Sequence, residues 1–171
     1  IFVSKLDASG SFLWAKRMGG TDIDRGRGIA VDASGNVYTT GGFQYTADFD
    51  PGAGVFNLTS AGIGDTFVSK LDTSGNFLWT KQMGGTSSAI GFAIAVDASG
   101  NVYTTGGFLG TADFDPGAGT ANLTNDGLVN VFVQKLSPIS PEVGELEFGT
   151  ADGVGDTGND QGYGIAVDAS G

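Results

Sequence analysis

The chain alternates short apolar runs with turn-forming residues along its whole length. One set of runs covers residues 93–96 (AIAV), 102–105 (VYTT), 132–136 (FVQKL) and 77–81 (FLWTK). Runs of four to six residues that are rich in Val, Ile, Phe, Tyr and Thr and end at turn signals are typical of β-strands. The 31 glycines also disfavour long helices, since each one in a helix costs about 1 kcal/mol relative to alanine. The pattern therefore predicts an all-β fold.

Four connections between these runs share nearly the same sequence, Asp-Ala-Ser-Gly or Asp-Thr-Ser-Gly. They begin at Asp7, Asp32, Asp72 and Asp97. In such a segment the aspartate can accept a hydrogen bond from the backbone two residues on, and the glycine can take a positive φ. This is the usual chemistry of a β-hairpin built on a type I turn with a bulge. Each repeat is therefore predicted to be a four-stranded antiparallel sheet.

The same stretches return at a fixed spacing. FVSKLDASGSFLWAKRMGGT begins at Phe2 and returns with few changes from Phe67, and IAVDASGNVYTTGGF begins at Ile29 and returns from Ile94, so the period is 65 residues. Four short strands repeated at a fixed period predict the blades of a β-propeller. The rival architecture, a parallel β-helix, requires a much shorter period. Bulky Trp14 and Trp79 recur at one repeat position and are expected between neighbouring sheets.

The strands predict about two and three-quarter blades in a single repeat domain over residues 1–171. Propellers usually close with four to eight blades, so the ring is expected to be incomplete. Either the chain is cut from a longer propeller, or copies join by sharing strands. The predicted divisions are two strands of a first blade in residues 1–28, a second blade in 29–92, a third blade with an irregular last strand in 93–163, and the first strand of a fourth blade in 164–171.

The combination of IAVDASGNVYTTGGF, TADFDPGAG and FVSKLDTSGNFLWTKQMGGT resembles the SBBP (seven-bladed beta-propeller) repeats of bacterial secreted and cell-surface proteins. The resemblance extends over essentially the whole chain. It implies a propeller on a secreted or cell-surface protein, with no enzymatic role generally attached. The chain departs from the pattern at residues 137–153, where two prolines replace the expected hairpin turn and no tryptophan is present.

Charge and composition narrow the functional classes. The net charge of −11 disfavours nucleic acid, because cations that neutralise phosphates supply much of that affinity. The sequence has no run of 18 apolar residues, so membrane insertion through a helix is not expected. Cysteine and histidine are absent, which excludes disulfides, thiolate nucleophiles and imidazole bases. No catalytic residue and no cofactor-binding residue is predicted.

The stretch TADFDPGAG occurs twice, at residues 46–54 and 111–119. Its alternating aspartates could bind calcium, which takes six to eight oxygen ligands. Against this, the fifth position of the pattern is Gly52 or Gly117, and no glutamate closes it. The favoured alternative is a hairpin tip, with Gly52 at positive φ after Pro51, in a ribbon beyond the four blade strands. The candidate calcium ligands are Asp48, Asp50, Asp113 and Asp115.

In an antiparallel blade the short Asp-x-Ser-Gly turns share one face of the disc, and the longer acidic loops share the other. Because function tends to lie on loops held by a rigid scaffold, we expect a non-enzymatic extracellular scaffold or adhesion module. Its partners would be a protein or surface glycan on the long-loop face, or other copies of the chain. The alternative is a subunit that assembles into a larger ring or filament by strand sharing. A propeller hydrolase or lyase is less favoured, because a catalytic pair is rarely duplicated in a repeat.

Overall fold

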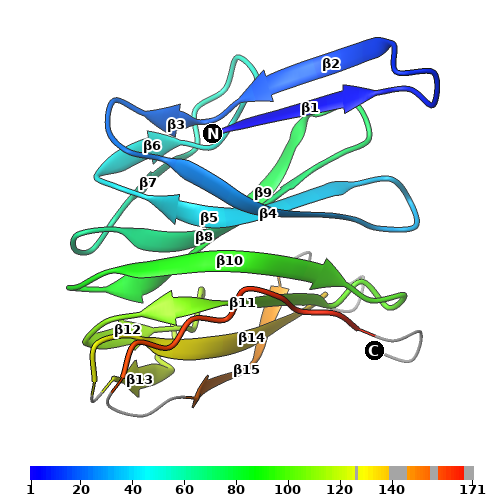
Figure 1. Ribbon diagram of the computed structural model, residues 1–171. Coiled ribbons are helices and arrows are strands. Elements are labelled where there is room, and N and C mark those ends of the chain that lie inside the picture. The colour runs from blue at the N-terminus through cyan, green and yellow to red at the C-terminus, as the bar shows by residue number, and fades with distance from the viewer. Residues whose placement is uncertain (126, 139–145, 155–157, 168–171) are drawn as a thin grey trace.

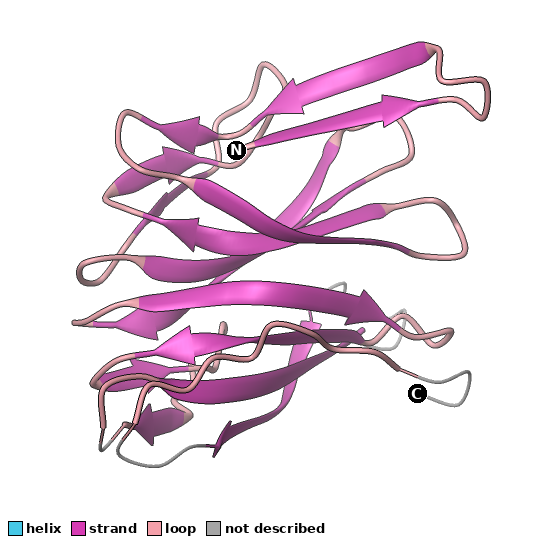
Figure 2. Ribbon diagram, viewed as in Figure 1, coloured by secondary structure: helices cyan, strands magenta, loops and turns pink. Residues whose placement is uncertain are grey.

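The computed structural model contains only strands, turns and loops in the part of the chain that it describes (Figures 1 and 2). It describes all residues except 126, 139–145, 155–157 and 168–171. The strands are β1 (Phe2–Leu6), β2 (Phe12–Arg17), β3 (Gly19–Gly20), β4 (Arg25–Val31), β5 (Val37–Phe43), β6 (Thr46–Asp48), β7 (Asn57–Thr59), β8 (Asp65–Leu71), β9 (Phe77–Gly85), β10 (Ala89–Val96), β11 (Val102–Phe108), β12 (Thr111–Asp113), β13 (Asn122–Thr124), β14 (Asn130–Pro138) and β15 (Leu146–Val154).

The strands form antiparallel sheets that stack face to face (Figure 1). Strands β4, β5, β8 and β9 make the second blade, and β10, β11, β14 and β15 make the third. The hairpin β1–β2 is the part of the first blade that is present, so the ring is not closed. These sheets confirm the all-β fold of four-stranded antiparallel blades.

The hairpin turns have the geometry that the sequence predicts. Gly10, Gly35, Gly75 and Gly100 have φ angles of 84°, 82°, 78° and 83°. In the first turn, the Ser9 N–H donates to Asp7 Oδ1 at 2.9 Å, and the same contact recurs in the other three. The turns that follow β1, β4 and β10 lie at the right of Figure 1, opposite the short strands β6, β7, β12 and β13. The two predicted loop faces are therefore distinct.

Apolar side chains fill the space between neighbouring sheets. All seven residues of β5 are buried, because sheets cover both faces of this strand. Val37 and Phe43 join a cluster with Val3 and Met18 of the first repeat, whereas Tyr38 joins residues of the third blade. Trp14 and Trp79 pack against these two clusters from their edges. The expected place of both tryptophans between sheets is confirmed.

The last strand of the third blade, expected to be irregular, is a nine-residue strand paired with β14. Its one register shift lies between Lys135 and Leu136, at the same repeat position as the shift between Lys70 and Leu71 in the second blade. Backbone pairing with β14 therefore persists although the tryptophan and the Asp-x-Ser-Gly turn are absent here. The connection over residues 139–145 lies outside the described residues.

Residues 158–167 run along the third sheet without forming a strand (red in Figure 1). They follow the path that β10 takes over the second sheet. The isolated bridge between Val129 and Asn159 repeats the one between Gly64 and Ser88. Among the residues that the structure describes, no strand lies beside this segment as β11 lies beside β10. Residues 168–171 of the expected fourth-blade strand lie outside the described residues, so the domain divisions stay a prediction.

Close approach of the inner strands requires glycine at defined positions. A Cβ on Gly91 of β10 would lie 2.3 Å from Thr40 Oγ1 of the neighbouring blade. Thr40 cannot simply turn away, because it is fully buried and its hydroxyl donates to the Phe67 carbonyl at 2.7 Å. Gly91 thereby sets the separation of the second and third sheets at their inner edge.

We expect Gly91→Ala to lower the free energy of unfolding by roughly 1–3 kcal/mol, the usual cost of overpacking. Denaturant unfolding followed by tryptophan fluorescence would measure this loss. Gly164→Ala is the matched control, because a Cβ at Gly164 meets no atom within 4 Å. Equal stability of the two variants would show that the sheets do not depend on contact at Gly91.

Candidate functional site

The repeated TADFDPGAG segment forms a small ribbon on the long-loop face. Strand β6 pairs with β7, and β12 pairs with β13, in the same register. Each ribbon also pairs with the end of the preceding repeat, because Asp48 lies opposite Gly19 of β3 and Asp113 lies opposite Gly84 of β9. The expected extra ribbon is confirmed, and it links each repeat to the one before it.

Aspartate side chains, and not a positive φ at glycine, shape the tip of each ribbon. Asp48 Oδ1 accepts hydrogen bonds from the N–H groups of Asp50 at 3.0 Å and Phe56 at 2.8 Å, and Asp50 Oδ1 accepts one from Gly52 at 2.7 Å. Asp113 and Asp115 repeat this arrangement in the second copy. The expected positive φ at Gly52 is wrong, because the Asp50 carboxylate holds the turn closed.

Phenylalanine anchors each tip to the core. Phe49 lies between the two aspartates of the first tip and is fully buried, with its ring 4.9 Å from that of Phe67 and 5.3 Å from that of Phe43. Phe114 occupies the same place in the second tip. Extended backbone alternates its side chains, so the buried phenylalanine turns its flanking aspartates outward. The tips are thus held rigidly on the sheets.

The structure brings the predicted calcium ligands together in pairs, with Asp48 beside Asp50 and Asp113 beside Asp115. One oxygen of each carboxylate is already used by backbone donors. Among the described residues, no group of three or more acidic side chains has an arrangement that could hold a metal ion. Calcium at these four residues stays a prediction.

An open cleft lies between each tip and the last strand of the preceding repeat. The two clefts have volumes of about 400 Å³ and 510 Å³. Each is lined by a lysine, a methionine and a glycine from the end of the preceding repeat (residues 16–19 or 81–84), and by the two aspartates, the proline and the first glycine of the tip. The shared residues are Lys16, Met18, Gly19, Asp48, Asp50, Pro51 and Gly52 in the first cleft and Lys81, Met83, Gly84, Asp113, Asp115, Pro116 and Gly117 in the second.

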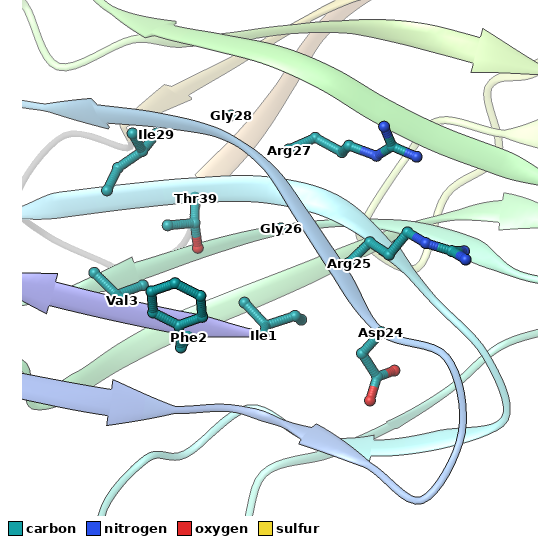
Figure 3. Close-up of a pocket in the computed structure, with 10 residues that line it drawn as sticks. All are labelled: Ile1, Phe2, Val3, Asp24, Arg25, Gly26, Arg27, Gly28, Ile29 and Thr39. Atoms are coloured by element: carbon teal, nitrogen blue, oxygen red, sulfur yellow. The ribbon is translucent and has the colours of Figure 1, made fainter.

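Sequence reasoning singled out the aspartates of these clefts but missed the lysines. Lys16 and Lys81 lie at equivalent positions, two residues before the Met-Gly-Gly that ends each strand segment. Their recurrence in the sequence could have marked these lysines as candidates. Their place beside the aspartates follows only from the pairing between repeats of β3 with β6 and of β9 with β12. A further cavity of about 620 Å³ lies elsewhere, beside β1 and β4 (Figure 3).

Asp65 lines the second cleft as a buried carboxyl group. Its Oδ2 accepts hydrogen bonds from the Ala61 N–H at 2.8 Å and the Gln82 side-chain amide at 2.6 Å. Burial raises the pKa of Asp65 above its ordinary value, although these hydrogen bonds act in the opposite direction. The third repeat carries the neutral Asn130 at the equivalent position, which avoids burying a charge.

We expect Asp65→Asn to stabilise the protein progressively as the pH rises. A raised folded-state pKa gives a stability contribution that is present below the ordinary pKa and is lost as pH rises through the folded value. Asparagine does not ionise and removes that loss. The free energy of unfolding of the variant should therefore rise relative to that of the wild type between about pH 4 and neutrality. Urea unfolding across this range provides the measurement.

Asp72→Asn is the matched control for Asp65→Asn. Hydrogen bonds from the backbone and side chain of Asn76 lower the pKa of the exposed Asp72. Its carboxylate therefore contributes stability above the ordinary pKa, and that contribution is lost as pH falls. The stability difference for this variant should have the opposite sign of pH dependence. Parallel profiles for the two variants would contradict the assigned role of Asp65.

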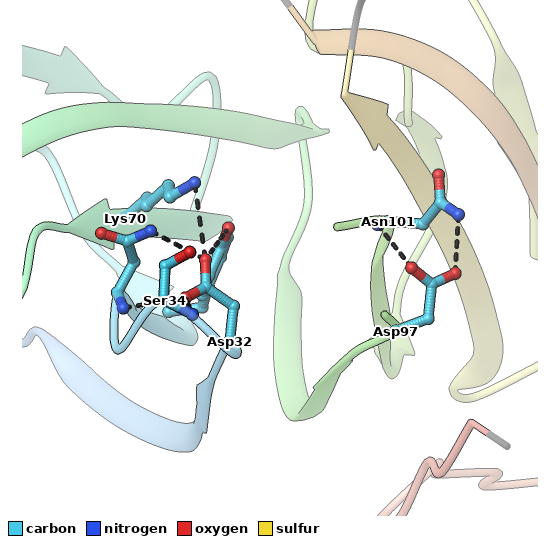
Figure 4. Close-up of polar contacts among 7 residues, drawn as sticks. Asp32, Ser34, Lys70, Asp97 and Asn101 are labelled. Carbon is cyan, nitrogen blue, oxygen red and sulfur yellow. Dashed lines mark hydrogen bonds and ion pairs between the residues drawn. The ribbon is translucent and has the colours of Figure 1, made fainter. Parts of the chain in front are cut away.

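The carboxylates on the turn face serve the hairpins. Asp32 accepts hydrogen bonds from the Asn36 side chain at 2.8 Å and the Tyr38 hydroxyl at 3.1 Å, with Lys70 Nζ at 3.8 Å (Figure 4). Burial raises the pKa of Asp32, but these contacts outweigh it, so the pKa lies below its ordinary value. Asp97 makes the same contacts with its own asparagine and tyrosine. These groups hold the hairpin turns.

Sheets that derive from one repeated sequence and pack in series define a β-propeller-type repeat protein. The family model of the SBBP beta-propeller repeat matches residues 13–41 and 78–106. Both regions are therefore SBBP beta-propeller repeats, as the sequence resemblance implied. Each match runs from the end of one blade through the first two strands of the next, so the repeat unit crosses the boundary between sheets.

Two curated proteins are similar to this chain. An uncharacterized WD repeat-containing protein of Acanthamoeba polyphaga mimivirus is 31% identical over 123 residues, which cover 63% of this chain and 9% of that protein. The regulatory protein FlaEY of Caulobacter vibrioides is 29% identical over 119 residues, which cover 67% of this chain and 12% of that protein. The chain thus spans about a tenth of the length of these relatives.

Proposed function

We propose that the chain is a non-enzymatic propeller scaffold of a secreted or cell-surface protein, and that it binds its partner through the long-loop face. The supporting observation is the recurrence of one cleft, with identical residues at seven equivalent lining positions, in two successive repeats. An enzymatic role has less support, because the duplicated aspartates already hold their own backbone.

The partner that suits two equivalent clefts is one that repeats its own units, such as a surface glycan, or a protein with repeated contacts. Each cleft offers a lysine ammonium and outward carboxylate oxygens, which can donate to and accept from hydroxyl groups. Two linked sites raise the apparent affinity for such a partner through effective concentration. Weak binding at each cleft would therefore suffice.

Reversing the charge of both clefts tests this proposal. We expect Lys16→Glu with Lys81→Glu to weaken binding to immobilised cell-surface polysaccharide or intact bacterial cells at least tenfold, measured by surface plasmon resonance or cell sedimentation. The matched control is Lys5→Glu together with Lys70→Glu, which makes the same charge change at residues that contact the turn face. Equal loss in both double variants would indicate a general charge effect and would contradict binding through the clefts.

Calcium is not required in this proposal. Because Asp48 Oδ1 and Asp50 Oδ1 already accept backbone hydrogen bonds, the tips are held without a cation. We expect the melting temperature to be the same in millimolar Ca²⁺ and in chelator. A ligand that binds only the folded state must raise stability, so a calcium-dependent increase that is lost in Asp48→Ala and Asp113→Ala would establish a calcium site.

A further inference from the structure

One position near the start of the innermost strand carries a different side chain in every repeat. It holds Arg27 in β4, Phe92 in β10 and Tyr163 in the segment of residues 158–167. The residue before it is glycine in all three repeats, and the second residue after it is isoleucine. The framework around the position is therefore constant, and its side chain is free to serve something other than the fold.

A β-bulge sets this position apart from the rest of the strand. The pairing of β4 with β5 shifts register between Gly26 and Gly28, and the pairing of β10 with β11 shifts at the same place, between Gly91 and Ala93. The extra residue of a bulge is left out of the strand pairing, and its side chain is redirected. Because β4 and β10 stand first in their sheets, the bulges bring these side chains to the inner edge of the blades.

The three side chains form one row that crosses the repeats. Arg27 Cζ lies 5.7 Å from the centre of the Phe92 ring, which stacks on the Tyr163 ring with 5.1 Å between centres and 27° between planes. The Tyr163 hydroxyl donates a hydrogen bond to the Gln161 side chain. A guanidinium held against an aromatic ring keeps its N–H donors available around its edge. The row therefore orients Arg27 without using its hydrogen-bonding capacity.

Arg27 is exposed and retains its charge for a ligand. In the part of the chain that the structure describes, neither Arg27 nor Arg25 forms an ion pair, and both extend to the same side of β4 (Figure 3). Asp24 points away from them, and its Oδ2 accepts a hydrogen bond from the Gly20 N–H at 2.6 Å. Two arginines without an acidic partner make a local anion site on a chain whose net charge is −11.

We propose that this row binds the terminal acidic sugar of a glycan. The sugar carboxylate pairs with the Arg27 guanidinium through two parallel hydrogen bonds, the geometry that this group favours. The apolar face of the sugar ring packs on the rings of Phe92 and Tyr163, as is usual for sites that combine aromatic walls with few polar groups. The net charge of −11 repels a long polyanion, so the site takes a ligand with a single carboxylate.

This inference goes beyond binding in the two clefts, because neither Arg27 nor the two rings line them. Its test is titration of the full chain with sialyllactose and with lactose, which lacks the acidic sugar, followed by NMR and calorimetry. We expect lactose to bind roughly tenfold more weakly or less. The ring protons of Phe92 and Tyr163 should shift when sialyllactose binds.

Two variants of Arg27 test the role of the guanidinium. Arg27→Gln should weaken sialyllactose binding roughly tenfold or more and remove the preference over lactose. Arg27→Lys should also bind more weakly than the wild type, because an ammonium keeps the charge but not the two parallel donors. Lys135→Gln is the matched control, since Lys135 Nζ lies 5.3 Å from the centre of the Tyr103 ring on the other face of the molecule. The control should bind as the wild type does.

The remaining outcomes separate this site from the clefts. Lys16→Glu with Lys81→Glu should leave sialyllactose binding unchanged, so that either proposal can fail without the other. Equal binding of lactose and sialyllactose would overturn the assignment of Arg27, as would equal loss in Arg27→Gln and Lys135→Gln. No binding of sialyllactose or of a disaccharide that ends in glucuronate would also overturn it. Tighter binding of heparin than of either ligand would overturn the preference for a single carboxylate.

Discussion

The structure depends on face-to-face packing between neighbouring sheets. Strand β5 is buried on both sides because one sheet covers each of its faces. In repeat proteins of this kind, stability is approximately the sum of each repeat and its interfaces with its neighbours. Gly42 of β5 follows from this constraint, because a Cβ there would lie 2.9 Å from the Ile90 side chain of the next sheet. Gly41 is required within its own sheet, where a Cβ would lie 1.8 Å from the Arg25 carbonyl oxygen of the paired strand β4.

The ribbons add a second connection between repeats at the outer edge. Because β6 pairs with β3 and β12 pairs with β9, each repeat is hydrogen-bonded to its predecessor as well as packed against it. The buried Phe49 and Phe114 fix the tips from below, and the aspartates fix them from within. Each cleft therefore has walls from two consecutive repeats whose relative position is set by backbone pairing. Walls that are held by backbone pairing keep the geometry of a site more precisely than a free loop does.

The sequence was sufficient to predict what depends on local chemistry. The Asp-x-Ser-Gly turns followed from an acceptor side chain and a glycine at positive φ, and the blade followed from four short strands at a fixed period. The sequence did not predict that aspartate carboxylates close the DFDPG tips. Proline and glycine fit a standard turn equally well, and the carboxylate contacts depend on the path of the chain after the turn. The burial of Asp65 was also missed, since a charged residue at the start of a strand is usually exposed. The backbone pairing between successive repeats is not indicated by any short sequence pattern.

The repeat also separates effects of sequence from effects of surroundings. Phe2, Phe67 and Phe132 share one sequence context, so their different burial reports only the neighbouring strands. The two outer sheets illustrate this in opposite ways. Residues 158–167 cover part of the third sheet, where Gly162 lies against Thr105 as Gly91 lies against Thr40, whereas β1 pairs only with β2 among the residues that the structure describes.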